Sequence, residues 1–335
     1  MRVVSTSALP IDLAAQVTAA VPGTVVEVPA RGHVGLAGLD LASADALVCL
    51  LLDRIDAALL ARAPGLRVVA NCAVGIDNID LAAATAAGVC VTNTPDVLTE
   101  ATAELAFALL IAGARRRGEG ERLVRSGAWT GWALDQLIGQ GLLGRTLGVV
   151  GFGRIGQAMA RRAHGFGMRV IYADPLQAGP SSPPAGPSPG AAPVPAEQVS
   201  IDELFATADA VSLHCPLTPE TRQLVNAERL AQMKPTAIVV NTARGGCVDE
   251  AALADALVQR KLFGAGLDVY AREPAVDPRL LEAPGVVLAP HIGSATTEAR
   301  TAMAQLCADA VIAALRGHRP GNLVNNVTPP WIRRS

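Results

Sequence analysis

Short aliphatic runs alternate with helix-sized segments through the first hundred residues of the chain. The runs have the length and side-chain character of buried strands, and they are Met1–Val4, Val25–Val28, Ala46–Leu51, Leu66–Ala70 and Cys90–Asn93. Ala- and Leu-rich segments lie between them, such as Asp80–Ala87, which is followed by Gly88 as a helix is by its C-cap. This alternation predicts a parallel α/β unit.

A second α/β pattern follows a long helical segment. Thr99–Arg117 reads as one unbroken helix that Thr99 and Glu100 open, and we expect it to lead into a second domain. Six further strand-like runs are Leu147–Val150, Met168–Tyr172, Ala210–Leu213, Ala237–Asn241, Ala265–Val269 and Val286–Leu288. Six strands with crossover helices predict a doubly wound sheet. Thr297–Leu315 is again helical, and we expect it to return to the first domain.

These elements predict two Rossmann-like, doubly wound parallel-sheet α/β domains with a cleft between them. A length of 335 residues agrees with two domains. The first is expected to be discontinuous and flavodoxin-like, formed by residues 1–97 plus 295–326, and the second to cover residues 98–294. Residues 177–195 are rich in Pro, Gly and Ser and are predicted to be a flexible surface insert with no catalytic role.

Composition and charge narrow the class of protein. Aromatic residues make up only 3% of the chain, so Ala, Val and Leu must fill the cores, and a net charge of -2 gives no reason to expect nucleic acid or a membrane surface. The cluster Arg115–Arg117 reads as the solvated end of a helix. Six scattered cysteines without metal-type spacing indicate reduced thiols, no metal site and a cytoplasmic location. Met1–Gln16 lacks the apolar core of a signal peptide, and no apolar run is long enough to span a membrane.

A glycine-rich turn marks a candidate cofactor site. Gly151-Phe152-Gly153-Arg154-Ile155-Gly156 follows a predicted strand and opens the predicted helix Gln157–His164, which is the context that the G-x-G-x-x-G fingerprint requires. Gly151 permits the tight turn, Gly153 lets the backbone approach a pyrophosphate, and Gly156 allows close helix packing. The helix N-terminus offers free N–H groups to the phosphates. Residues 98–294 are therefore predicted to be an NAD-binding Rossmann domain.

Asp174 ends the next predicted strand, where an acidic residue bonds the ribose hydroxyls of the adenosine. A carboxylate there repels a 2′-phosphate: two unit charges about 4 Å apart cost about 4 kcal/mol at an effective dielectric of 20. Asp174 therefore favours NADH over NADPH. The other interpretation is that Asp174 is only a turn residue before Pro175.

Three reactive side chains follow predicted strands of the second domain. Arg244, Glu273 and His291 come after Ala237–Asn241, Ala265–Val269 and Val286–Leu288, and the working groups of an open parallel sheet gather at these carboxyl ends. A guanidinium can fork onto a substrate carboxylate, and an imidazolium can donate a proton as a hydride reaches a carbonyl carbon. A carboxylate can orient the imidazole and favour its charged form. The set indicates reduction of a small 2-keto acid.

His214 is a rival to His291, because it also ends a predicted strand. Its neighbours Cys215 and Pro216 lead into a loop expected to lie along the cofactor, so we assign His214 cofactor contact or no role. Ala243 and Gly293, which follow strands at the same edge, are assigned to the cofactor site as well.

The sequence resembles the D-isomer-specific 2-hydroxyacid dehydrogenase family from about Leu66 to Arg300. The matching pieces are the glycine fingerprint, the segments around Arg244, Glu273 and His291, and the runs Asn71–Asp80 and Thr92–Asp96. The resemblance implies that Arg244 anchors the substrate, that His291 donates the proton and that Glu273 is its partner. It also implies substrate contacts from the backbone amides of Val74 and Gly75, and cofactor contacts at Arg154, Ile155, Asp174, Thr242 and Asp268.

Asn93–Glu100 and Trp129–Trp132 look like the glyoxylate and hydroxypyruvate reductase branch of this family. That resemblance implies a homodimer in which Trp132 reaches the active site of the partner subunit. The chain departs from the pattern in its Pro-rich insert, and Asp174 differs from the basic or small residues of branch members that prefer NADPH.

Two other functions remain open. Phosphite dehydrogenase shares the fold and the catalytic set, but its activity looks tied to a Lys where this chain has Val74. NAD-sensing corepressors also retain the set, although they carry long terminal extensions and little sequence follows Asn326 here. Oxidation of NADH by glyoxylate separates an enzyme from a sensor.

Overall fold

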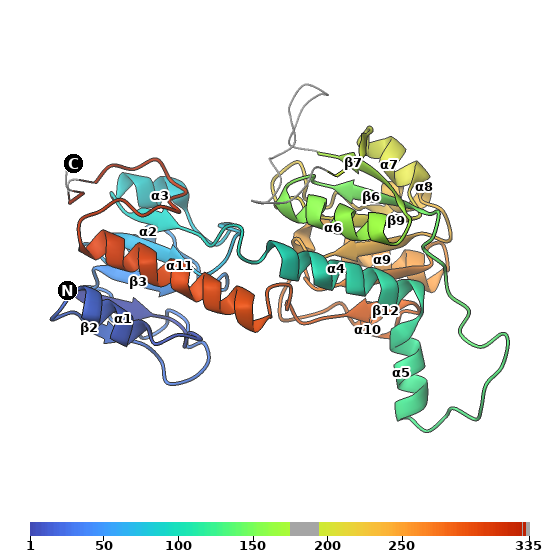
Figure 1. Cartoon of the computed structure of the whole chain (residues 1–335), viewed down its shortest axis with the longest axis horizontal. Coiled ribbons are helices and arrows are strands. Elements are labelled where there is room, and N and C mark those ends of the chain that lie inside the picture. Colours follow the sequence, from blue (N-terminus) through green and yellow to red (C-terminus); the bar gives the residue numbers. More distant parts are fainter. Residues whose placement is uncertain (175–193, 330, 333–335) are drawn as a thin grey trace. The chain divides into compact units, whose positions relative to one another are not determined.

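The chain forms two compact units, Met1–Leu98 with Ala295–Ser335, and Thr99–Ser294. The structure is a computed structural model that describes residues 1–174, 194–329 and 331–332 (Figure 1). Apart from Val194 and Pro195, the predicted insert 177–195 lies outside the described residues. No helix in the described part of the chain is both long and apolar enough to cross a bilayer.

The first unit is built on a five-stranded parallel sheet. Its strands are β1 (Arg2–Ser5), β2 (Val25–Glu27), β3 (Ala46–Cys49), β4 (Val68–Asn71) and β5 (Cys90–Thr92). The order β2-β1-β3-β4-β5 is that of flavodoxin-like folds, and it reverses direction between β1 and β3. Such a reversal opens a crevice beside the carboxyl ends of these two strands.

Helices cover both faces of this sheet because its strands are apolar on both sides. The helices are α1 (Leu13–Ala20), α2 (Ala57–Ala61), α3 (Leu81–Ala86) and α11 (Thr297–Leu315). Leu13 of α1 and Val311 of α11 share one core with Val68, whereas Leu59 of α2 and Ala84 of α3 share the other with Val69. The C-terminal helix thus completes the first unit although it follows the second in sequence.

The second unit is built on a seven-stranded parallel sheet. Its strands are β6 (Thr146–Val150), β7 (Arg169–Ala173), β8 (Glu197–Gln198), β9 (Ala210–Leu213), β10 (Ile238–Asn241), β11 (Gly264–Leu267) and β12 (Val286–Leu288). The order β12-β11-β10-β9-β6-β7-β8 is doubly wound and reverses between β6 and β9. The prediction of two parallel α/β domains is confirmed, and β8 is a strand that the sequence pattern did not predict.

Two layers of helices enclose this sheet. The helices are α4 (Thr99–Ala114), α5 (Arg117–Arg125), α6 (Arg154–Gly165), α7 (Ile201–Thr207), α8 (Ala227–Gln232), α9 (Glu250–Val258) and α10 (Pro278–Glu282), with a 3-10 turn at Gly245–Cys247. Leu110 of α4 and Met159 of α6 share one core with Val149, and Phe205 of α7 and Leu253 of α9 share the other with Val239. Each core is fully closed to solvent at these positions.

The prediction of one unbroken helix over Thr99–Arg117 is wrong. Helix α4 ends at Ala114, Arg116 takes a left-handed conformation with φ 49°, and α5 starts at Arg117. The amide of Gln140 donates to the carbonyl oxygen of Ala114, and the Arg116 guanidinium pairs with Glu119. Arg115 and Arg116 therefore lie in a turn between two helices, and Arg117 begins the second of them.

Candidate active site

The glycine-rich turn joins β6 to α6, as the fingerprint requires. Gly151 has φ +87°, and a Cβ on it would lie 2.8 Å from the backbone nitrogen of Cys215. A Cβ on Gly156 would lie 2.2 Å from the carbonyl oxygen of Gly151, so this glycine lets the helix approach the strand. A Cβ on Gly153 would meet no atom within 4 Å, which leaves space above the turn for a ligand.

The first turn of α6 presents its backbone donors to that space. Gly153 is the N-cap and makes no side-chain cap, so it does not satisfy the amides of the first turn. Arg154 is exposed and Ile155 half-buried at the start of the helix. Asp174 follows β7, and its carboxylate lies 3.4 Å from the amide nitrogen of Phe152 in the glycine turn. The turn and the acidic residue therefore belong to one site.

The end of β9 borders the same turn, and β10 is the next strand of the sheet. Contact with Cys247, burial and the Asp174 carboxylate all raise the pKa of the Cys215 thiol, so Cys215 and Asp174 lie near one another. Pro216 is exposed beside Cys215. Thr242, which follows β10, is buried, and its hydroxyl has no hydrogen-bond partner among the described residues. A buried hydroxyl without a partner is costly, which suits a position that bonds a ligand.

Three strand ends bring the predicted catalytic side chains together. The Nδ1 atom of His291 lies 2.8 Å from Oε2 of Glu273, and the two side chains are 27% and 21% exposed. Arg244 is close enough that its charge lowers the pKa of Glu273. Segments 29 and 18 residues apart in sequence thus meet at one edge of the sheet, because parallel strands end on the same side.

The loop that carries His291 is clamped to β11. Both carboxylate oxygens of Asp268 accept backbone hydrogen bonds, from Ile292 at 2.7 Å and from Gly293 at 2.8 Å. The carbonyl oxygen of Asp268 accepts a third, from the amide of His291 at 2.8 Å. His291 itself has φ 55°, a strained conformation for a residue with a Cβ. The clamp stabilises this conformation and fixes the direction of the imidazole.

The electrostatics of the set favour an ionised carboxylate. Burial raises the pKa of Glu273, but hydrogen bonds from His291 and from the Tyr270 amide, together with the charges of His291 and Arg244, leave that pKa below its usual value. An ionised carboxylate only accepts hydrogen bonds, so Nδ1 of His291 carries the proton in this pair. Burial is also the main reason that the pKa of Asp268 is raised.

Two residues that the sequence pattern did not indicate hold the set in place. The Tyr270 amide donates to Oε1 of Glu273 at 2.9 Å, and the Tyr270 hydroxyl donates to the Ala289 carbonyl at 2.9 Å, two residues before His291. Asn241 braces the turn that carries Arg244: its side chain accepts from the Ala243 amide at 3.0 Å and donates to the Arg244 carbonyl at 2.9 Å. The signal that could have indicated these positioning roles is a polar residue at or just after the end of a buried strand, as Asn241 and Tyr270 are.

The rival histidine has a different environment. Nε2 of His214 lies 2.9 Å from the Ser212 hydroxyl, and burial lowers the pKa of His214 to about 3. His214 is therefore neutral near pH 7.

In the first unit, the loop after β4 turns its carbonyl groups inward. Asn93 donates to the Val74 carbonyl at 2.9 Å, and Asn71 donates to the Gly75 carbonyl at 2.8 Å. The amides of Val74 and Gly75 donate to no acceptor within the described part of the chain. Val74 is 37% exposed. Two neighbouring unbonded N–H groups are a suitable site for a carboxylate.

Trp132 lies on the surface of the second unit. It belongs to the segment between α5 and β6, which projects away from the sheet, and it is 80% exposed (Figure 1). No cluster of three or more Cys, His, Asp or Glu side chains in residues 1–174 and 194–329 is arranged to hold a metal ion.

Known proteins are similar to this chain in sequence and in fold. The family profile described as "D-isomer specific 2-hydroxyacid dehydrogenase, NAD binding domain" matches residues 107–293. The chain is 50% identical over 285 residues to a glyoxylate reductase of Thermococcus litoralis, covering 84% of this chain and 83% of that protein. It is also 50% identical over 295 residues to a glyoxylate reductase of Korarchaeum cryptofilum, with 86% of each chain covered.

A solved structure agrees with these relatives. The TT0316 protein of Thermus thermophilus superimposes with a TM-score of 0.86 at 45% identity, covering 97% of this chain and 100% of that one. The fold, the match to the NAD-binding profile and sequence identities of 45–50% agree on one family. The chain therefore belongs to the D-isomer specific 2-hydroxyacid dehydrogenase family.

Proposed function

We propose that this protein reduces a small 2-keto acid, with glyoxylate or hydroxypyruvate as the best candidates, to the 2-hydroxy acid. The observation that carries the proposal is the 2.8 Å contact between His291 and Glu273, with the charge of Arg244 close by, at the carboxyl edge of a doubly wound sheet. The glyoxylate reductases that are 50% identical to it over 285 and 295 residues support the choice of substrate.

In this reaction His291 supplies the proton. Glu273 engages Nδ1, so the proton that leaves is the one on Nε2. As a hydride reaches the carbonyl carbon, the C=O π bond breaks and the carbonyl oxygen takes this proton, which yields the hydroxyl group. The carboxylate of Glu273 stabilises the imidazolium before the transfer and orients the ring toward the substrate. His214 does not suit this role, because a group whose pKa is about 3 has no proton to give near neutral pH.

Arg244 is the substrate anchor in this proposal. Its guanidinium presents several donors in one plane, which fits a carboxylate and the adjacent carbonyl oxygen together. The unbonded amides of Val74 and Gly75 supply further donors for the substrate carboxylate. Binding the carboxylate by fixed N–H groups selects 2-keto acids over simple aldehydes and ketones.

The residues present fit a nicotinamide dinucleotide. The open space above Gly153, the uncapped first turn of α6 and the unpartnered hydroxyl of Thr242 suit its phosphates and polar groups. When bound, the nicotinamide supplies the hydride. Asp174 favours NADH over NADPH, since its carboxylate repels a 2′-phosphate. The further assignments at Arg154, Ile155, Cys215, Pro216, Ala243, Asp268 and Gly293 belong to the same proposal.

A substrate and cofactor panel tests the proposal. Glyoxylate, hydroxypyruvate, pyruvate and 2-ketogluconate are each offered with NADH and with NADPH, and loss of absorbance at the nicotinamide band is followed. We expect turnover of the first two with NADH, and His291→Ala to abolish it while NADH still binds. Absence of turnover with every keto acid, alongside NADH binding, would instead favour a sensor.

We also propose that the protein is a cytoplasmic homodimer. Six large apolar side chains are more than half exposed on α5 and the segment after it, and they are Val124, Trp129, Trp132, Leu134, Ile138 and Leu143. Such a concentration of apolar surface is typical of an interface, and Trp132 is the residue expected to reach the active site of the partner subunit. All six cysteines are free, which suits a reducing compartment. Sedimentation of the wild type and of Leu134→Glu tests the dimer.

A further inference from the structure

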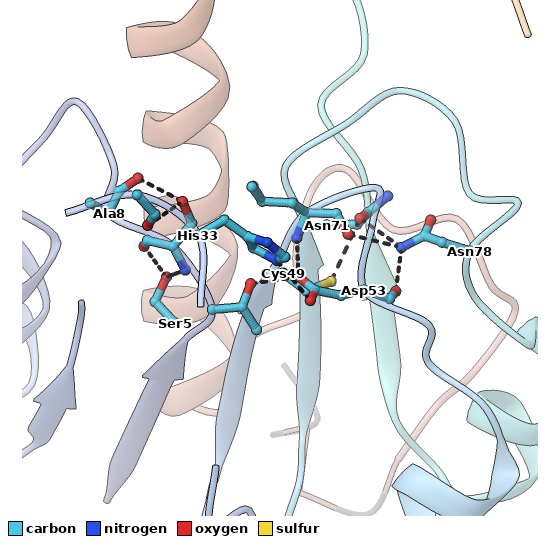
Figure 2. Close-up of polar contacts among 11 residues, drawn as sticks. Ser5, Ala8, His33, Cys49, Asp53, Asn71 and Asn78 are labelled. Atoms are coloured by element: carbon cyan, nitrogen blue, oxygen red, sulfur yellow. Dashed lines mark hydrogen bonds and ion pairs between the residues drawn. The ribbon is translucent and has the colours of Figure 1, made fainter. Parts of the chain in front are cut away.

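A chain of polar side chains crosses the carboxyl edge of the five-stranded sheet. Figure 2 shows His33, Asp53, Asn71 and Asn78 lying in one row across the strand ends. The row begins where the strand order reverses between β1 and β3, which is the place where a sheet of this topology usually binds a ligand. Here polar side chains occupy that place, and Asp53 and Asn71 among them are buried.

Asp53 is the centre of the row. It is 3% exposed, and its carboxylate accepts from the Thr6 hydroxyl at 2.5 Å, the Leu50 amide at 2.8 Å and Nε2 of His33 at 2.9 Å. The three partners come from the segments that follow β1, β2 and β3. Because a buried carboxylate is stable only when its oxygens are bonded, these contacts fix the turn that contains Leu50 and Asp53.

Asn78 and Asn71 extend this fixed turn to the next strand. The side-chain amide of Asn78 donates to the carbonyl of Asp53 at 2.9 Å, to the carbonyl of Leu50 at 3.2 Å and to Oδ1 of Asn71 at 3.3 Å. Asn71, the last residue of β4 and fully buried, then donates to the Gly75 carbonyl at 2.8 Å. An unbroken series of contacts therefore runs from His33 to Gly75.

Gly75 connects this series to the proposed substrate site, because its amide is one of the two proposed to bind the substrate carboxylate. A peptide group is planar, so holding the Val74 carbonyl inward turns the Gly75 N–H outward, and holding the Gly75 carbonyl inward does the same for the next N–H of the loop, that of Ile76. Asn93 donates to the Val74 carbonyl and Asn71 to the Gly75 carbonyl, and Asn71 in turn accepts from Asn78 and so continues the series.

We propose that the series His33–Asp53–Asn78–Asn71 positions the Val74–Gly75 loop so that its amides receive the substrate carboxylate. These four are positioning residues: each acts through its neighbour, and none is assigned a contact with substrate. The inference rests on the proposed function for the identity of the ligand, and on the hydrogen bonds alone for the order of the loop.

Two kinds of variant test it. Asn78→Ala removes the central link, and we expect the KM for glyoxylate to rise about tenfold, the loss expected for roughly one hydrogen bond to a charged group, while kcat changes less than about twofold. His33→Ala removes the far end of the series, where the side chain is partly exposed and folding is least at risk, and should raise KM about threefold. His33→Gln, which keeps a donor for Asp53, should restore the wild-type KM.

Asn325→Ala is the matched control. Asn325 is a buried asparagine of the first unit, and like the half-buried Asn78 it makes three hydrogen bonds, to the Val91 amide, the Val89 carbonyl and the Thr85 hydroxyl, but none leads to the loop. Its loss should lower the melting temperature about as much as Asn78→Ala does and leave KM unchanged. Equal KM values for the two variants overturn the proposal.

Hydrogen exchange separates this proposal from the proposed function. Exchange in the peptide covering residues 71–80 should quicken in Asn78→Ala and not in Asn325→Ala, whatever the protein catalyses. Unchanged exchange in Asn78→Ala refutes the positioning role. Faster exchange in a protein that turns over no 2-keto acid refutes the proposed function and leaves the ordering of the loop in place.

Discussion

Replacing Glu273 by Gln removes one charge and almost no volume from the catalytic set. The carboxylate lies 2.8 Å from Nδ1 of His291, and the side chains are 27% and 21% exposed, so water screens the pair only in part. A hydrogen bond to a charged group contributes about 1.5–3 kcal/mol, and the partial exposure argues for the lower end. The imidazolium form therefore loses about 1.5 kcal/mol in Glu273→Gln.

This loss should change how the rate of keto acid reduction depends on pH. One pH unit corresponds to about 1.4 kcal/mol, so the pH at which keto acid reduction falls to half its maximum should move down by about one unit. The assay is kcat/KM for glyoxylate with NADH from pH 5 to pH 10. Glu250→Gln is the control, because Glu250 bonds the nearby Ala271 amide and has no bond to His291. An alkaline limb that does not move in Glu273→Gln would refute the assigned partnership.

The free energy of unfolding should also depend on the charge of Glu273. The folded protein lowers the pKa of Glu273, so the stabilisation is present above the unfolded value of about 4.3 and is lost as pH falls through the lower folded value. Urea unfolding should thus show the wild type to be more stable than Glu273→Gln at pH 7. A gap that persists at the lowest pH would contradict this sign.

Three further variants test the site. Arg244→Lys should raise the KM for glyoxylate about tenfold or more, since a point charge cannot fork onto a carboxylate, and an unchanged KM would contradict the anchor role. Gly156→Ala should weaken NADH binding more than about tenfold in a titration, because its Cβ would lie 2.2 Å from the Gly151 carbonyl, whereas a Cβ on the control Gly165 meets nothing within 4 Å. Burial lowers the pKa of His214 to about 3, so the unfolded chain binds the extra proton below about pH 6.5 and folding weakens as pH falls. Between pH 7 and pH 5, the free energy of unfolding measured with urea should therefore fall about 1–2 kcal/mol less in His214→Gln than in the wild type. Equal decreases would refute this.

Local sequence indicated most of the strands and the members of the candidate site. In the described part of the chain, apolar runs of strand length identified eleven of the twelve strands, because the central strands of a sheet covered on both faces are apolar throughout. The glycine fingerprint could be interpreted from its neighbours alone, since the positive φ of Gly151 and the close contacts of Gly156 arise within one strand, turn and helix. Arg244, Glu273 and His291 could be grouped because the ends of parallel strands share an edge.

Tertiary structure decided what depends on partners far away in sequence. Nothing in Arg115–Arg117 disfavours a helix, and α4 ends where residue 140 bonds its last carbonyl. Strand β8 has two residues and no apolar pattern, and it exists only as a partner of β7. Asp53 is indistinguishable in sequence from other acidic loop residues, and only the fold brings Thr6 and His33 from two distant segments to its carboxylate. Apolar burial follows a periodic pattern that the sequence displays, whereas a buried hydrogen bond requires two particular groups that only the folded chain brings within about 3 Å.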